Sequence, residues 1–258
     1  MNNLILEVND VAISFDGVRA VNGANLNVAV DSVTSVIGPN GAGKTTLFNL
    51  ISGAIKPDSG TILFEGMEIQ NLLPHKIADR GIIRTFQGAK VIKRLSVLDN
   101  LILGGQDNPG ESLLNFFNPK ARKAYEAQAR DRAMELLQQI GIERFAHEYA
   151  GILSGGQRKL LDLARALMAN PTMLLLDEPF AGVNPTLVEK LLEVLQDLRT
   201  KHHLTFLLIE HDLETVMNIS DRVIVMAEGR VIADGAPNSI YENQAVIDAY
   251  LGTRKATS

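Results

Sequence analysis

A glycine-rich segment at residues 38–46 has the composition of a phosphate-binding loop. It matches the pattern G-x-x-x-x-G-K-[ST] and reads Gly38, Pro39, Asn40, Gly41, Ala42, Gly43, Lys44, Thr45, Thr46. Glycine accepts positive φ angles, so successive backbone N–H groups can turn toward one anion at the start of a helix. Lys44 is expected to reach the outer phosphates of a nucleotide, and the Thr45 hydroxyl to bind Mg²⁺. The alternative is a glycine-rich turn that matches the pattern by chance.

Two adjacent carboxylates, Asp177 and Glu178, follow the apolar run 173–176. Such a run is typical of a strand buried on both faces, and its end would place the carboxylates at the carboxyl edge of a sheet, beside the phosphate loop. Asp177 suits the Mg²⁺ shell, through a water molecule, and Glu178 suits a general base that orients an attacking water. Taken alone, the same residues could be the acidic start of a helix.

A third segment has a serine and two glycines directly before a predicted helix at residues 157–168. It reads Leu153, Ser154, Gly155, Gly156, Gln157. A hydroxyl and open backbone at a helix N-terminus form a second anion-binding end. One nucleotide does not need two such ends from the same chain. Taken alone, Ser154 could be a simple N-cap.

The elements around these motifs alternate between strand and helix patterns. We predict strands at 25–30 and 33–37, a helix at 45–52, and buried strands at 173–176 and 204–209. Between the last two lies a helix at 185–199, whose apolar stripe consists of Val188, Leu191, Leu192, Leu195 and Leu198. This β-α-β order indicates an α/β fold with a parallel sheet.

The middle of the chain is different, because residues 96–140 contain no convincing strand. We predict a long amphipathic helix at 120–140, with an inward face of Tyr125, Ala129, Ala133, Leu136, Leu137 and Ile140. We interpret this region as a helical subdomain inserted into the α/β core. The expected division is a core of residues 1–90 and 160–235, a helical subdomain 91–159, and a C-terminal helical segment and tail 236–258, frayed from Gly252.

Composition narrows the function classes. The 258 residues are 46% hydrophobic and 21% charged, which excludes a disordered chain. A net charge of -5 argues against nucleic acid as a partner. The chain has no cysteine, which excludes disulfides and thiolate chemistry. No secretory signal and no apolar run near ~20 residues is visible, so we expect a soluble chain that reaches a membrane only through a partner.

The three motifs, in this order, resemble the Walker A, Walker B and signature motifs of the ATP-binding cassette (ABC) transporter family, over nearly the whole chain. The resemblance implies a P-loop NTPase core with a mostly parallel sheet, an antiparallel β subdomain and an inserted helical subdomain. It also implies ATP and Mg²⁺ as cofactors. In the family, a signature such as Leu153–Gln157 closes over the ATP of a second cassette, in a head-to-tail dimer with two ATP molecules at its interface.

The resemblance assigns three further residues. Phe15 is similar to the aromatic residue that stacks on adenine, and Gln87, in Arg84-Thr85-Phe86-Gln87, to the glutamine that contacts Mg²⁺ and the attacking water and links to the membrane partner. His211 resembles the switch histidine that touches the γ-phosphate. Asn184 stands where many members have aspartate, which puts its contribution across the dimer in doubt. His202 and His203 are interpreted as part of a solvated loop.

Several segments, among them residues 84–87, 182–185, 208–222 and 246–252, resemble the LivG-type subunits of branched-chain amino-acid importers. This resemblance implies transmembrane permease subunits, a second cassette (a paralogue or a copy of itself) and, indirectly, a solute-binding protein, with the chain peripheral on the cytoplasmic face of the inner membrane. Relatives for urea or short amides share most of these features, and residues 178–183 resemble the corresponding segment of lipopolysaccharide-export ATPases. A soluble ABC ATPase in translation or DNA repair is a further alternative, although the two cassettes or long coiled coil of that class are absent. A P-loop kinase or GTPase would not need the Leu153–Gln157 signature.

Overall fold

The computed structural model describes residues 3–85, 91–105 and 119–254 of the chain. These residues form two compact units, each described here by itself. The first unit is made of Met1–Arg84, Thr172–Pro179 and Leu198–Ser258, and the second of Thr85–Pro171 and Phe180–Asp197. Among the described residues, no helix is both long enough and apolar enough to cross a membrane.

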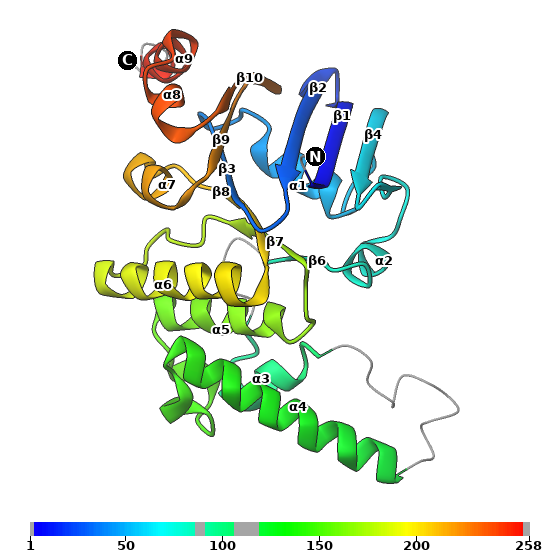
Figure 1. The fold of residues 1–258 in the computed structure, drawn as a ribbon, viewed down its shortest axis with the longest axis vertical. Helices are drawn as coiled ribbons and strands as arrows, with labels where there is room; N and C mark the ends of the chain where they lie inside the picture. Colours follow the sequence, from blue (N-terminus) through cyan, green and yellow to red (C-terminus); the bar gives the residue numbers. More distant parts are fainter. Residues whose placement is uncertain (1–2, 86–90, 106–118, 255–258) are drawn as a thin grey trace. The chain divides into compact units, whose positions relative to one another are not determined.

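A six-stranded sheet forms the centre of the first unit (Figure 1). Its strand order is β10-β9-β3-β8-β7-β6, parallel except for the antiparallel edge strand β10. The strands are β3 (Val33–Ile37), β6 (Ile82–Arg84), β7 (Met173–Asp177), β8 (Thr205–Ile209), β9 (Arg222–Ala227) and β10 (Arg230–Gly235). Every residue of β3, β7 and β8 is buried, as the continuous apolar runs at 173–176 and 204–209 predicted for β7 and β8. The α/β fold class is therefore confirmed.

A second, antiparallel sheet of the first unit has the order β2-β1-β4-β5. Its strands are β1 (Leu4–Phe15), β2 (Val18–Ala29), β4 (Ser59–Phe64) and β5 (Met67–Glu68). The sequence predicted only residues 25–30 as the strand that is now β2, whereas the strand begins at Val18. Its first residues are exposed, so the alternation of buried and exposed positions that marks a strand is weak there.

The core of the first unit joins both sheets through helix α1 (Lys44–Ile51). Leu47, Phe48, Leu50 and Ile51 of α1 are fully buried in one cluster with side chains of β1, β2, β4 and the parallel sheet. The short helix α2 (Pro74–Ala78) adds Ile77 to the same cluster. Because α1 follows the phosphate loop directly, this burial fixes the end of the loop on the core.

A smaller apolar cluster lies at the other side of the first unit, where α7 (Leu213–Ile219), α8 (Pro237–Tyr241) and α9 (Gln244–Arg254) gather near β9 and β10 (Figure 1). It contains Ile37, Val216, Val223, Val225, Ile240 and Val246. Helix α9 continues to Arg254, so the expectation of a frayed tail from Gly252 is wrong for residues 252–254. Residues 255–258 of that tail lie outside the described residues.

The described residues of the second unit are mainly helical. Helices α3 (Val97–Ile102), α4 (Pro119–Ile140) and α5 (Gly155–Leu167) pack on one another, with short 3₁₀ helices at Glu143–Phe145 and Ala150–Ile152. The predicted inward face of α4 is buried at Ala129, Ala133, Leu136, Leu137 and Ile140, whereas Tyr125 is partly exposed. The second compact unit contains the whole of α5 together with α3 and α4. The subdomain limits 1–90, 91–159, 160–235 and 236–258 stay predictions.

Helix α6 (Pro185–His202) crosses the boundary between the units. Its buried stripe is Leu191, Val194, Leu195 and Leu198, which follows the i, i+3, i+4, i+7 spacing of a helix face. The predicted stripe included Val188 and Leu192 and omitted Val194. Val188 and Leu192 are partly exposed. The predicted buried face was therefore slightly rotated about the helix axis from the observed one.

Candidate functional site

The phosphate loop connects the end of β3 to the start of α1, as the motif predicted. Its glycines adopt φ angles of 145° at Gly38, 81° at Gly41 and 98° at Gly43. A Cβ atom on Gly38 would overlap the carbonyl oxygen of Met226, and one on Gly43 would overlap that of Ala20. Glycine is thus required at positions 38 and 43 both by the backbone angle and by the lack of space.

The first turn of α1 is open to an anion. Gly43, its N-cap, supplies no side-chain hydrogen bond, and the turn has no acidic residue. The first N–H groups of a helix have no partner within the helix, and they carry the positive end of its dipole. The loop behind them is held by the N–H of Gly229, which donates to the Ala42 carbonyl at 3.1 Å. A helix start of this kind suits a phosphate.

Lys44 is buried, with 9% of its surface exposed. Its Nζ donates hydrogen bonds to the carbonyl oxygens of Gly38 at 2.7 Å and Pro39 at 3.0 Å. Burial lowers the pKa of Lys44, and the negative charges of Glu178 and Asp177 oppose this shift. The acidic pair therefore lies close enough to the phosphate loop for its charges to act on Lys44. Phosphate oxygens are the natural replacement for the two carbonyls that the ammonium now uses.

Asp177 ends β7 at the carboxyl edge of the sheet and is buried. Its Oδ2 accepts a hydrogen bond from Arg84 Nη2 at 3.2 Å. Burial raises the pKa of Asp177 and the Glu178 charge adds to this rise, whereas the hydrogen bond and charge of Arg84 and the charge of Lys44 lower it. The Asp177 carboxylate is thus largely removed from water, and the positive charges of Arg84 and Lys44 both act on it.

Arg84 is a site residue that the sequence analysis did not single out. It is the last residue of β6, next to β7, and its Nη1 donates to Asn49 Oδ1 at 2.6 Å and to Ser52 Oγ at 3.3 Å. The guanidinium carbon lies 5.7 Å from the ring centre of Phe48. The sequence feature that could have identified Arg84 was its position directly after the apolar pair 82–83 and three residues before Gln87.

Glu178 and His211 lie side by side after neighbouring strands. Glu178 has a φ angle of 52°, and its N–H donates to the carbonyl oxygen of Ile209, the last residue of β8, at 3.0 Å. This left-handed conformation is uncommon outside glycine and turns the chain sharply after β7. Glu178 Oε1 lies 3.5 Å from His211 Nδ1. The structure therefore brings together the carboxylate that the sequence predicted as a general base and the imidazole that the resemblance assigned to the γ-phosphate.

Phe15 is exposed at the end of β1, where Asp16 and Gly17 turn the chain into β2. β2 then passes beside the phosphate loop, because the Ala20 carbonyl blocks the space at Gly43. An exposed aromatic ring at the start of this turn is able to stack on a base.

The Ser154 segment begins α5 in the second unit with a complete capping box. Ser154 Oγ accepts from the Gln157 N–H at 3.2 Å, and Gln157 Oε1 accepts from the Ser154 N–H at 2.9 Å. Gly156 is buried, and a Cβ there would meet the side chains of Leu187 and Val183. Ser154 and Gly155 are exposed, which leaves the helix start accessible from outside.

The remaining predicted residues are placed as follows. Gln87 lies outside the described residues. Asn184 is exposed, and its Oδ1 accepts from the Thr186 N–H at 3.0 Å at the start of α6. His203 is exposed and its Nδ1 lies 3.0 Å from Asp31 Oδ2. His202 is the last residue of α6.

The donor atoms at the site suit Mg²⁺. This ion prefers oxygen ligands and is usually held by one or two carboxylates together with substrate phosphates. Thr45 contributes an exposed hydroxyl at the start of α1, and Asp177 a carboxylate whose Oδ1 lies outside the ion pair with Arg84. No group of three His, Cys, Asp or Glu side chains in the described part of the chain could hold a metal by itself. The phosphates would therefore complete the shell.

Comparison with known proteins places the chain in a family. Residues 21–181 match the family model described as ABC transporter. The chain belongs to the ABC transporter family. Residues 230–256 match a second model, described as branched-chain amino acid ATP-binding cassette transporter. The chain is thus an ATP-hydrolysing subunit of that family, as the three motifs predicted.

Relatives match the ABC cassette along its whole length. It is 42% identical over 253 residues, 98% of this chain and 99% of the relative, to the high-affinity branched-chain amino acid transport ATP-binding protein BraF of Pseudomonas aeruginosa. It is 40% identical over 254 residues, 98% of this chain and 99% of the relative, to the corresponding protein LivG of Escherichia coli. Among solved structures, the ADP conformation of MJ1267, an ATP-binding cassette of an ABC transporter, has a TM-score of 0.83 and 38% identity, and the match covers 96% of this chain and 99% of that one.

Proposed function

We propose that this ABC subunit hydrolyses ATP to power a membrane importer of branched-chain or other hydrophobic amino acids. The observation that carries the solute class is the match of residues 230–256 to the branched-chain amino acid model. The similarity to BraF and LivG over nearly the full length of both chains supports the same class.

The proposed hydrolytic site uses the geometry at the edge of the parallel sheet. The N–H groups at the start of α1 and the Lys44 ammonium bind the phosphates, and Phe15 stacks on adenine. Thr45, Gln87 and, through water, Asp177 hold Mg²⁺, which neutralises phosphate charge when bound. The exposure of Thr45 and the placement of Asp177 at the strand end support this donor set.

Glu178 is the proposed general base, and His211 contacts the γ-phosphate. The carboxylate receives a proton from the attacking water, while the imidazole orients the phosphoryl group that is attacked. The 3.5 Å distance between Glu178 Oε1 and His211 Nδ1 supports a shared task, since both side chains can then reach one water and one phosphate. Most of the remaining rate enhancement comes from positioning and charge, as is general for phosphoryl transfer.

The proposed assembly contains a second cassette, permease subunits and a solute-binding protein. The exposed Ser154 and Gly155, with the capped helix start behind them, support a surface that closes over ATP bound to the partner cassette. Gly156 and Gln157 complete the segment proposed for this closure, and Gln87 is proposed to link the site to the permease. We place the chain on the cytoplasmic face of the membrane, with a paralogue as the second cassette.

Purification of the tagged chain from its own cells in mild detergent tests this assembly. Identification by mass should find multi-spanning permeases and a second cassette.

In proteoliposomes of that complex, the loaded solute-binding protein should stimulate ATP hydrolysis with leucine but not with urea. Stimulation by urea or a short amide alone would replace the proposed solute, and recovery of ribosomal or repair proteins without permeases would contradict the transport role.

A further inference from the structure

A tight turn at residues 180–183 follows the proposed general base in the chain. The Val183 N–H donates to the Phe180 carbonyl oxygen at 3.1 Å, and Gly182 has a φ angle of 67°. A positive φ at the third residue of such a turn is typical of type II, which favours glycine there. The hydrogen bond of the turn itself uses the Phe180 carbonyl. The carbonyl of Ala181 is therefore available to a donor from another element.

That donor is Lys159, in the second turn of α5, the helix that the signature segment begins. Its Nζ donates to the Ala181 carbonyl oxygen at 2.6 Å, in a partly buried contact. Hydrogen bonds from a charged donor are shorter and stronger than those between neutral groups. Both residues belong to the second unit. The signature helix therefore holds the turn by the peptide group at its centre.

A close approach of α5 to the same segment accompanies this hydrogen bond. Gly156 lies three residues before Lys159, hence on the same face of α5. Gly156 is buried, and a Cβ atom there would lie 2.4 Å from Leu187 Cδ2 and 3.2 Å from Val183 Cγ1. Glycine thus allows the helix start to pack on the turn and on the first residues of α6, which lies beside α5 (Figure 1). Packing and hydrogen bond together fix the turn on α5.

We propose that Lys159 is a positioning residue for Glu178: it holds the turn that follows Glu178 and so preserves the backbone conformation that directs the carboxylate. The inference deepens the proposed function and rests on the role of Glu178 as general base. Lys159 lies outside the signature Leu153–Gln157, and the sequence analysis gave it no role.

The backbone of Glu178 needs restraint on both sides. Its φ angle of 52° is strained for a residue with a side chain, and such an angle persists only when the surrounding structure fixes it. On one side, the Glu178 N–H donates to the Ile209 carbonyl oxygen at 3.0 Å. On the other, only Pro179 separates Glu178 from the turn. Release of the turn would let the backbone relax, and Glu178 Oε1 would leave its place 3.5 Å from His211 Nδ1.

The variant Lys159→Met keeps the apolar stem of the side chain and removes the donor. We expect kcat for ATP hydrolysis by the purified complex to fall about tenfold, because misplacement of a catalytic group by about 1 Å can cost up to about 10²-fold. KM for ATP and the affinity for a fluorescent ATP analogue should change less than about twofold, since the phosphate loop keeps its own contacts. Amide exchange at residues 181–184 should become faster. Lys123→Met, at an exposed position of α4, is the matched control and should change none of these values.

A double-mutant cycle with Glu178→Gln separates positioning from a general structural role. If Lys159 acts through the carboxylate, Lys159→Met should reduce turnover no further once the base has been removed. A general loss of structure would instead multiply the two losses. Lys159→Arg keeps a charged donor and should retain most of the wild-type kcat.

Each other outcome has a distinct meaning. Unchanged kcat or unchanged amide exchange in Lys159→Met overturns the inference, as do multiplied losses in the double variant. Equal losses of kcat in Lys159→Arg and Lys159→Met also overturn it, because the donor would then not be the feature that matters. Near-normal turnover in Glu178→Gln alone would contradict the proposed role of Glu178, and this inference with it.

Discussion

Arg84 and Asp177 form a buried ion pair at the carboxyl edge of the parallel sheet, with Arg84 Nη2 3.2 Å from Asp177 Oδ2. The other terminal nitrogen of the same guanidinium binds Asn49 of α1. One side chain thereby ties the ends of β6 and β7 to the helix that follows the phosphate loop. Asp177, whose carboxylate is proposed to face Mg²⁺, is therefore oriented by the Arg84 guanidinium, which is itself held by Asn49 of α1.

Arg84→Met should destabilise the chain strongly, because it leaves Asp177 buried without its partner. Removing one member of a buried pair typically costs about 3–5 kcal/mol, and we expect the lower end since the site opens toward the phosphate loop. Urea unfolding measures this change. Arg132→Met is the matched control: its pair with Glu135 is exposed, so it should cost less than about 0.5 kcal/mol. Equal effects of the two variants would contradict the importance of the buried pair.

Asp177 should make stability depend on pH in magnesium-free buffer. Its pKa is raised above the ordinary 3.8, first by burial. Between 3.8 and the raised pKa the native state keeps a proton that the unfolded state has released, so stability falls as pH rises through this window. Asp177→Asn cannot ionise.

The difference in unfolding free energy, Asp177→Asn minus wild type, should therefore rise with pH across this window, by at most about 1.4 kcal/mol per pH unit, and then level off. Urea titrations at a series of pH values measure it. A difference that is flat, or that falls with pH, would contradict a raised pKa.

The local motifs could be predicted from the sequence because each depends on adjacent residues. The phosphate loop needs glycines at set positions, and β7 and β8 contain continuous apolar runs, which are typical of strands buried on both faces of a parallel sheet. The α/β class followed from the order of these segments alone.

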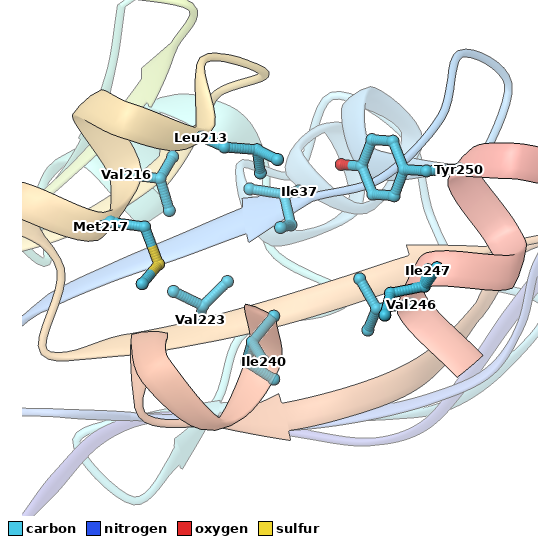
Figure 2. A pocket seen from close by; sticks show the side chains of 9 residues that line it. All are labelled: Ile37, Leu213, Val216, Met217, Val223, Ile240, Val246, Ile247 and Tyr250. Carbon is cyan, nitrogen blue, oxygen red and sulfur yellow. The ribbon is translucent and has the colours of Figure 1, made fainter. Parts of the chain in front are cut away.

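Arg84 could not be predicted in this way, because its partners come from β7 and α1, which are distant in sequence. Its role appears only once the strand order places β6 beside β7. The extent of α9 has the same origin, since Val246 and Tyr250 pack in the apolar cluster that contains Ile37, which is distant in sequence (Figure 2). The side chain of Gln87 lies outside the described residues, so its role stays a prediction.

Glu178→Gln should keep ATP binding and reduce turnover by at least about 10²-fold, the usual scale for the loss of a general base. The amide retains the size of the side chain but cannot accept the proton. Steady-state hydrolysis and ATP-analogue binding measure the two quantities. Glu193→Gln, at an exposed position of α6, should leave both unchanged. Near-normal turnover in Glu178→Gln would remove Glu178 from the proposed mechanism.

Two glycines of the phosphate loop should differ in their tolerance of alanine. At Gly41 the space around a Cβ is open, so Gly41→Ala adds only the strain of a positive φ, about 1–2 kcal/mol. At Gly43 the Cβ would also overlap the Ala20 carbonyl, and β2 or α1 must shift. Gly43→Ala should therefore lower the urea midpoint clearly more than Gly41→Ala. The reverse order would contradict the loop geometry.

Ser154 and Ser96 are both serine N-caps, and their comparison separates capping from closure of the dimer. Ser96 Oγ accepts from the Asp99 N–H at 3.0 Å at the start of α3, and Ser154 plays the same part for α5. Either serine-to-alanine change should cost about 1 kcal/mol of stability. Only Ser154→Ala should also weaken the ATP-dependent association of cassettes, measured by light scattering with the Glu178→Gln variant as background. Loss of association in both variants would make stability the cause, and loss in neither would remove Ser154 from the interface.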